Sequence, residues 1–344
     1  MVCECPCLVP EPLAKIVPMT RVLVTGGAGY IGSHACKALA LAGYEPIVLD
    51  NLSIGHADAV KWGPLEIGNV RDGEFLDMVM TRHQPEVVMH FAATSNVGES
   101  VANPAKYYAN NVLGSLSLLD ATRRHDIRYF IFSSTCATYG IPASLPIVET
   151  LPQAPINPYG ATKLAVEHAL ADYGAAYGLN WASMRYFNAA GADEDGELGE
   201  RHSPETHAIP LAIMASLGQI PRFNVFGTDY PTPDGSCIRD YIHVTDIAEA
   251  HVNALTYLIS GGQSTAFNLG TGFGTSVLEM LAAVGKCTGR PLSINYQPRR
   301  DGDPAALYAA ATKASELLGW RPKYTEIEPI VATAVRWFIA HHGK

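Results

Sequence analysis

The sequence predicts an α/β protein, with a doubly wound parallel sheet covered by helices and joined to a smaller α/β lobe. Two observations carry this prediction. Short apolar runs alternate with helix-like segments from residue 21 to about residue 186, which is typical of parallel strands linked by right-handed crossovers. After residue 188 the alternation loosens, and a loop rich in Gly, Pro, Asp and Glu follows at residues 191–205.

A glycine-rich turn opens the series. The apolar run 22–24 is too short for a helix, the motif Gly27-x-Gly29-x-x-Gly32 follows it, and residues 31–41 have a helical pattern. Glycines let the backbone turn tightly and approach a pyrophosphate, whose charge is bound by the free N–H groups at the helix start. The motif therefore predicts a dinucleotide-binding Rossmann domain.

Asp50 indicates which dinucleotide is bound. It ends the next apolar run, 46–49, and lies 21 residues after Gly29, where a carboxylate accepts hydrogen bonds from an adenosine ribose. An NADP site would need a nearby arginine for the 2′-phosphate, and residues 51–56 contain none. We therefore expect NAD as the cofactor.

The remaining elements are predicted from the same patterns. The strand at 238–243 and the helix at 246–258 are expected to rejoin the first sheet. The other predicted strands are 87–91, 128–132, 181–185, 266–269 and 292–296, and the other predicted helices are 107–125, 159–177, 277–286, 327–340 and one that begins at 207. We assign residues 20–188 to the NAD-binding Rossmann domain, rejoined by about 236–260, and residues 189–344 to a substrate-binding lobe.

Composition excludes several classes of partner. The chain has 344 residues, 48% of them hydrophobic, and a net charge of −9, which disfavours nucleic acid and anionic membrane surfaces. It contains no run of 18 apolar residues that could span a bilayer. Seven scattered cysteines indicate reduced thiols and a cytoplasmic location.

The first 19 residues do not resemble a signal peptide, because they lack a basic start and an apolar centre. We interpret them as a disordered leader, or as a misassigned start with Met19 as the true one. The cluster Cys3-x-Cys5-x-Cys7 lacks a fourth ligand and the spacing of a zinc site, so no metal site is predicted.

The pair Tyr159-x-x-x-Lys163 is the candidate catalytic unit. Residues four apart on a helix share a face, so the ammonium can lie beneath the phenol and lower its pKa from about 10. A phenolate could take a proton from a sugar hydroxyl while hydride leaves the same carbon. Thr135, at the carboxyl end of a predicted strand, could relay or orient that proton, or could simply satisfy its own turn.

These features resemble the extended short-chain dehydrogenase/reductase family, and within it the UDP-glucose (UDP-galactose) 4-epimerases. The resemblance runs from Arg21 nearly to Trp337. Residues 135–140 with 206–210 are similar to a subgroup that includes UDP-xylose/UDP-arabinose 4-epimerases. The motifs that carry the resemblance to the UDP-glucose 4-epimerases include Val24-Thr-Gly-Gly-Ala-Gly-Tyr-Ile-Gly-Ser-His34, Val97-Gly-Glu-Ser100, Pro158-Tyr-Gly160, Arg185-Tyr-Phe-Asn188, Arg239-Asp-Tyr-Ile-His243 and Arg299-Arg-Asp-Gly-Asp303.

The resemblance implies an isomerase with tightly bound NAD, acting as a homodimer on UDP-sugars. It implies Tyr159 as base, Lys163 as electrostatic partner and Thr135 as hydroxyl relay. The expected cofactor-binding residues are Gly26, Gly27, Gly29, Tyr30, Ile31, Gly32, Asp50, Asn51, Asn69, Val70, Phe91, Ala92, Ala93, Asn110, Ser133, Tyr159, Lys163 and Tyr186. The expected substrate-binding residues are Thr135, Tyr159, Phe187, Asn188, His207, Phe226, Arg239, Tyr241, Arg300, Asp303 and Leu307.

Four positions depart from the family pattern. Asn69 replaces an Asp near the adenine, and Ser95 replaces a Lys beside the cofactor. His207 stands at a position that is usually Asn, and Leu307 stands where a Tyr or Cys flanks the hexose. These departures leave the hydride chemistry intact and leave the preferred sugar open between glucose/galactose, xylose/arabinose and N-acetylhexosamines.

Two other functions were weighed. Dehydratases of this family have an Asp-Glu pair after the catalytic Thr, and decarboxylases have a Glu two residues after it, whereas Cys136 and Ala137 follow Thr135 here. A non-catalytic NAD-binding regulator would lack the Tyr and Lys of the catalytic unit, and both are present. A 4-epimerase of UDP-sugars, with UDP-glucose and UDP-galactose first and UDP-xylose and UDP-L-arabinose as the alternative, is therefore the predicted function.

Overall fold

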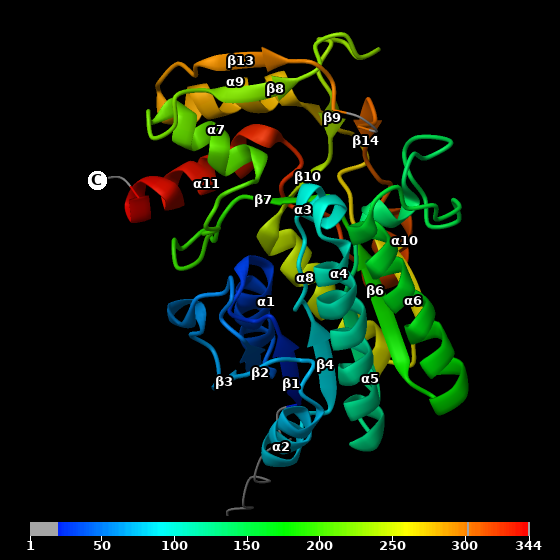
Figure 1. Ribbon diagram of the computed structural model, residues 1–344. Helices are drawn as coiled ribbons and strands as arrows, with labels where there is room; N and C mark the ends of the chain where they lie inside the picture. Colours follow the sequence, from blue (N-terminus) through cyan, green and yellow to red (C-terminus); the bar gives the residue numbers. More distant parts are fainter. Residues whose placement is uncertain (1–19, 301–302, 343–344) are drawn as a thin grey trace, which may run out of the picture.

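A seven-stranded parallel sheet lies at the centre of the larger part of the molecule (Figure 1). The computed structural model describes residues 20–300 and 303–342. The strand order is β11-β6-β5-β4-β1-β2-β3. From β1, the chain adds β2 and β3 on one side and then β4, β5, β6 and β11 on the other, as in doubly wound sheets. The strands are β1 Arg21–Thr25, β2 Glu45–Asp50, β3 Leu65–Ile67, β4 Val87–His90, β5 Tyr129–Ser133, β6 Asn180–Arg185 and β11 Thr265–Asn268. The predicted fold class is confirmed.

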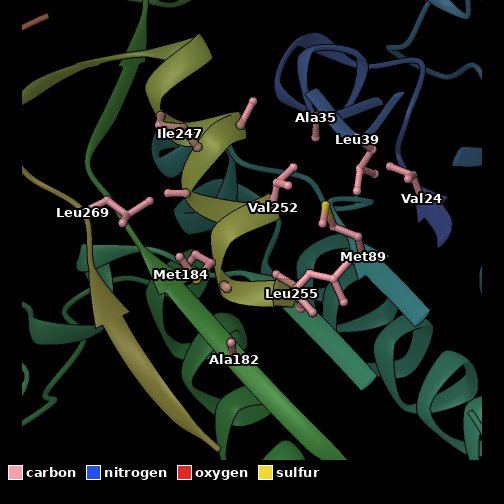
Figure 2. Close-up of a cluster of buried hydrophobic side chains, with 14 of the residues drawn as sticks. Val24, Ala35, Leu39, Met89, Ala182, Met184, Ile247, Val252, Leu255 and Leu269 are labelled. Carbon is pink, nitrogen blue, oxygen red and sulfur yellow. The ribbon is translucent and has the colours of Figure 1, made fainter. Parts of the chain in front are cut away.

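Helices cover both faces of this sheet. On one face, α1 packs against α8, and Leu39 and Leu255 join sheet residues such as Val24 and Met89 in one apolar cluster (Figure 2). On the other face, α2, α5 and α6 bury Leu76, Leu118 and Val166 against the strands. The helices are α1 Tyr30–Leu41, α2 Gly73–His83, α5 Gly114–Arg124, α6 Pro158–Tyr177 and α8 Val244–Ile259.

The expectation that a strand at 238–243 rejoins the sheet is wrong. This segment divides into β9 (Ile238–Arg239) and β10 (Tyr241–His243), and both pair outside the large sheet. The seventh strand is instead β11, which pairs with β6. Only the helix that follows, α8, returns to the sheet, because its apolar stripe is buried against α1 and the strands.

The rest of the chain builds a third apolar cluster above the carboxyl ends of the strands (Figure 1). Helices α7 Ala208–Ser216, α9 Val277–Thr288 and α11 Ile327–His342 pack there with β8 Phe223–Phe226 and β13 Ile294–Gln297. The smaller elements are β7 Asn188–Ala190, β12 Thr275–Ser276, β14 Ala306–Leu307, α10 Thr312–Leu318, and the 3-10 turns η1 Ala57–Ala59 and η3 Cys136–Tyr139. The boundary that we predict at residue 188 stays a prediction.

The predicted helix at 107–125 is a composite. It runs through α4 (Pro104–Tyr107), a π-helical stretch η2 (Tyr108–Leu113) and α5, and it follows a short helix α3 (Val97–Ala102). π-Helical turns are rare and often lie at functional sites.

Within the described residues, no helix is both long and apolar enough to cross a membrane.

Candidate active site

The predicted site residues gather at the carboxyl edge of the large sheet, where open α/β sheets bind ligands. Strand β1 leads into the glycine loop, β2 ends at Asp50, and β5 ends at Ser133. Helix α6 begins above this edge and contributes Tyr159 and Lys163. The glycine loop, Asp50 and the catalytic pair are therefore brought to one edge by the strand order, although the pair lies more than a hundred residues after the other two in sequence.

The glycine loop has the geometry that a pyrophosphate requires. Gly26 has a φ of +73°, and a Cβ there would lie 2.6 Å from the backbone nitrogen of Ala92. A Cβ on Gly32 would lie 2.2 Å from the carbonyl oxygen of Gly26. No side chain caps the start of α1, which also has no acidic residue in its first turn. Its N–H groups are therefore left for an anion, and the loop fits NAD.

Asp50 is buried against the same loop. Its Oδ2 accepts a hydrogen bond from the backbone N–H of Ala28 at 3.1 Å, and its Oδ1 accepts one from Leu52 at 2.8 Å. Burial raises the pKa of this carboxyl, and the hydrogen bonds oppose that rise. Asn69, where relatives have an Asp, accepts from the N–H of Arg71 at 3.0 Å. Its side chain thus orders its own turn.

Other predicted cofactor residues line the neighbouring strand ends. The backbone N–H groups of Phe91 and Ala92 donate to the carbonyl of Thr25, which ties the end of β4 to the glycine loop. Asn110 lies in the π-helical stretch. The hydroxyl groups of Ser133 and Tyr186 are 2.5 Å apart. These contacts hold the carboxyl ends of β1, β4, β5 and β6 as one surface.

Tyr159 is held at the first turn of α6. Asn157 caps this helix by accepting a hydrogen bond from the N–H of Gly160 at 2.9 Å. A Cβ on Gly160 would lie 2.6 Å from the carbonyl of Ala137, so glycine lets the helix approach η3. Thr135 directly precedes η3, and its hydroxyl group hydrogen-bonds Tyr159. The predicted base and relay are therefore in contact.

The expected lowering of the Tyr159 pKa is not found. Burial raises the pKa of Tyr159 to about 12, and the hydrogen bond from Thr135 only partly opposes it. The Lys163 ammonium donates to the carbonyl of Ser133 at 2.7 Å and lies over the ring of Phe132. Burial also lowers the pKa of Lys163 to about 7. Both charges are disfavoured for the same reason, since the pocket that brings the groups together removes water from each.

Several predicted substrate residues form two contacting groups beside Thr135. Phe187 and Leu307 pack with Cys136 and Tyr139 in a small apolar cluster. Strand β14 pairs with β9 and sets Leu307 opposite Arg239, which forms an ion pair with Asp303.

Four other predicted substrate residues lie in neighbouring segments. The guanidinium of Arg300 lies 3.8 Å from the ring centroid of Phe226. Asn188 lies opposite Tyr241 in the β7–β10 pair and donates to the carbonyl of Asp240 at 3.2 Å. Residues 301 and 302 of the Arg-rich motif lie outside the described residues.

Two predicted residues make contacts that the sequence did not indicate. The hydroxyl of Tyr30 donates to the carbonyl of Gly191 at 2.6 Å, so this cofactor residue also ties the glycine loop to the second lobe. His207 precedes α7 and contacts Glu200 and Glu205. No described contact of His207 is with Arg239 or Asp303.

The sequence did not reveal a buried polar network next to Lys163 on α6. Glu167 pairs with Arg185, and it also accepts a hydrogen bond from Ser134 at 2.5 Å. Arg185 donates to the hydroxyl of Tyr139 at 2.7 Å. Glu167 stands one turn after Lys163, so the spacing of two ionisable residues on one helix face was the signal that could have revealed it.

The chain is similar to proteins of known activity over nearly its whole length. Residues 22–270 match the model of the NAD dependent epimerase/dehydratase family. A UDP-glucose 4-epimerase of Rhizobium meliloti is 57% identical over 317 residues, which is 92% of this chain and 96% of that protein.

Two solved structures agree with this. A UDP-glucose 4-epimerase from Brucella ovis, in complex with NAD, is 55% identical with a TM-score of 0.91, covering 93% of this chain and 98% of that one. One from Bifidobacterium longum, in complex with NAD+ and UDP, is 38% identical with a TM-score of 0.89, covering 94% of this chain and 99% of that one. The chain belongs to the NAD-dependent epimerase/dehydratase family, and relatives that are 55–57% identical to it are UDP-glucose 4-epimerases.

Proposed function

We propose that this protein interconverts UDP-glucose and UDP-galactose by NAD-dependent epimerisation at the sugar's C4. The observation that carries the proposal is the contact between Tyr159 and Thr135 at the carboxyl edge of the sheet. Lys163 stands one turn along the same helix, and the glycine loop opens at the same edge. This is the arrangement that a reversible oxidation of a secondary alcohol needs.

Each residue has a separate task in the reaction. Tyr159 takes the proton of the 4-hydroxyl group, and Thr135 orients or relays that proton. NAD held by the glycine loop and Asp50 would supply the hydride acceptor and donor, and its positive charge would favour the Tyr159 phenolate. Lys163 is the electrostatic partner of Tyr159, and its ammonium is held in the pocket by the hydrogen bond that it donates to the carbonyl of Ser133. The resulting 4-keto sugar would rotate in the pocket and present its opposite face to the hydride. Tyr159 would then return the proton to the oxygen at C4.

The residues of the second lobe suit the UDP part of the substrate. Arg239 and Arg300 can bind a diphosphate through charge-assisted hydrogen bonds. Phe226 presents an aromatic ring to which Arg300 is already stacked, and such a ring suits a uracil base. Asp303 holds Arg239 in place through their ion pair. In this proposal the substrate joins the two lobes, with its sugar against Tyr159.

The proposal is tested with purified protein and no added NAD. UDP-glucose should be converted to UDP-galactose, because NAD is regenerated in each turnover and stays bound. Denaturing the protein should release NAD or NADH, since Asp50 disfavours a 2′-phosphate and no arginine lies nearby in sequence. The same assay with UDP-xylose, UDP-L-arabinose and UDP-N-acetylhexosamines then shows which UDP-sugar is converted fastest. Release of NADP, or bound NAD without turnover of any UDP-sugar, would contradict the proposal.

Leu307 is proposed to set the room beside the sugar. It packs on the cluster that contains Phe187, and a tyrosine there would fill more of that space. Leu307→Tyr should therefore lower kcat/KM for UDP-N-acetylglucosamine about tenfold more than for UDP-glucose, which is within the discrimination that steric pockets achieve. The matched control is Leu317→Tyr, an exposed position on α10. Equal losses on both substrates would show that residue 307 does not gate the pocket.

We also propose that the protein is a cytoplasmic homodimer. The helices that follow β4 expose the apolar side chains of Val97, Val101, Tyr108 and Leu113. A second copy that covers this face would remove them from water. Light scattering on the purified chain measures the mass directly, and a monomer at micromolar concentration would contradict the dimer.

A further inference from the structure

Ser133, Ser134 and Thr135, at the carboxyl end of β5, form a short segment that supplies two contacts to the catalytic pair. The carbonyl of Ser133 accepts the hydrogen bond from the Lys163 ammonium at 2.7 Å, and the side chain of Thr135 interacts with Tyr159. Ser134 lies between these two residues and is almost fully buried. The geometry around the predicted base therefore depends on where this segment lies.

Backbone hydrogen bonds tie the segment to β6. The N–H of Ser134 donates to the carbonyl of Met184 at 2.9 Å, and the N–H of Cys136 donates to the carbonyl of Tyr186 at 3.0 Å. Bonds between neighbouring strands lie in the plane of the sheet, whereas α6 packs on the face of the sheet. The spacing between the segment and α6 is therefore left to side-chain contacts.

Ser134 connects the segment to α6 through a carboxylate that does not itself react. Its hydroxyl donates to Glu167 Oε1 at 2.5 Å. Glu167 lies one turn after Lys163 on α6. Its carboxylate is held by Arg185 of β6 and by the side-chain amide of Gln153, which donates to Oε2 at 3.0 Å. The carboxylate is thus a fixed point that orients the segment.

Neutralising Arg185 does not require the contact with Ser134. The guanidinium Nε of Arg185 donates to Glu167 Oε1 at 3.0 Å and a second nitrogen donates to Oε2 at 2.5 Å, so the two charges already form a forked pair. A serine hydroxyl carries no charge, so its hydrogen bond adds position rather than neutralisation. The charge of Glu167 also opposes the effect of burial on the Lys163 pKa. Both contributions act at the catalytic pair.

We propose that Glu167 is a positioning residue for the reaction, and that it acts through Ser134 on the Ser133 carbonyl and on the Thr135 side chain. This inference rests on the proposed function, in which Tyr159 is the base. Glu167 touches neither the sugar nor the cofactor in that reaction. Its contribution is to hold the proton relay and the ammonium at their places beside the phenol.

The test is a double-variant cycle on the full chain with NAD bound. Ser134→Ala should lower kcat for UDP-glucose about ten- to a hundredfold, because small displacements of catalytic groups cost this much. Its KM and Tm should change little, since the pair of Glu167 with Arg185 is kept. Glu167→Gln should lower both kcat and Tm. In the double variant the two losses in kcat should not add, because both substitutions break the same link.

Ser183→Ala is the matched control. Ser183 is fully buried on β6, and its hydroxyl makes no hydrogen bond with a described residue. This variant should keep the wild-type kcat. A wild-type kcat in Ser134→Ala would overturn the inference, and so would losses that add in the double variant. If Glu167→Gln does not fold, Ser134→Ala decides alone.

The inference and the proposed function can fail separately. A wild-type enzyme that epimerises UDP-glucose, with an unchanged kcat in Ser134→Ala, leaves the proposed function intact and overturns only the role of Glu167. If the wild type converts no UDP-sugar, the proposed function fails, and a crystal structure of Ser134→Ala with NAD bound decides the inference. Loss of the contact between Thr135 and Tyr159 would support it, and an unchanged contact would overturn it.

Discussion

Tyr159→Phe should lower kcat by about 10²–10⁴-fold and leave KM for the UDP-sugar nearly unchanged. The substitution keeps the ring and removes the hydroxyl group that interacts with the Thr135 side chain. In the proposed function, Arg239 and Arg300 bind the substrate, so the loss should appear in the chemical step. Single-turnover formation of NADH, followed by its absorbance, isolates that step from product release.

The control for this variant is Tyr173→Phe, the same substitution on the same helix at a position that contacts Tyr177. It should retain the wild-type rate. Thr135→Val should be milder than Tyr159→Phe, because a water molecule can carry the proton in place of the threonine hydroxyl. A near-wild-type single-turnover rate in Tyr159→Phe would refute its role as the base and transfer that role to Thr135 or another residue.

Glu167→Leu should destabilise the protein by about 3–5 kcal/mol, because it leaves the guanidinium of Arg185 buried without a counter-charge. The two side chains are only 5% and 8% exposed, so solvent cannot compensate for the lost pair. The same substitution removes the one charge that raises the pKa of Lys163 against burial. Urea unfolding followed by circular dichroism measures the free energy of unfolding, with NAD present in all samples.

An exposed ion pair provides the comparison. Glu328 pairs with Lys286 at the surface, where water screens both charges, so Glu328→Leu should change the free energy of unfolding far less than Glu167→Leu. The double variant Glu167→Leu/Arg185→Met should recover most of the stability, since it removes both buried charges. A loss as small for Glu167→Leu as for Glu328→Leu would show that the buried network does not stabilise the fold.

Local patterns in the sequence were enough to locate the cofactor fold. The glycine motif at residues 27–32 and Asp50 are recognised from short spacings along the chain. The alternation of apolar runs with helix-like segments is recognised from the period of each single element. The predicted strands at 128–132 and 181–185 match β5 and β6 to within a residue or two. Tyr159 and Lys163 could be proposed from the sequence because they are four residues apart, which is one turn of a single helix.

The tertiary structure decided what depends on packing between distant segments. Strand 238–243 reads like a sheet strand, yet the edge of the large sheet beside β6 is taken by β11. The pKa of Tyr159 was expected to fall because of the neighbouring charge, and it rises because burial acts on both members of the pair. The pairing of Glu167 with Arg185 depends on where β6 meets α6, and hydrophobic periodicity carries no information about that. The sequence alone thus determined the fold class and singled out candidate residues for the chemistry, which stay predictions. Charge states and long-range pairings required the fold, because both are set by desolvation and by contacts between segments far apart in the chain.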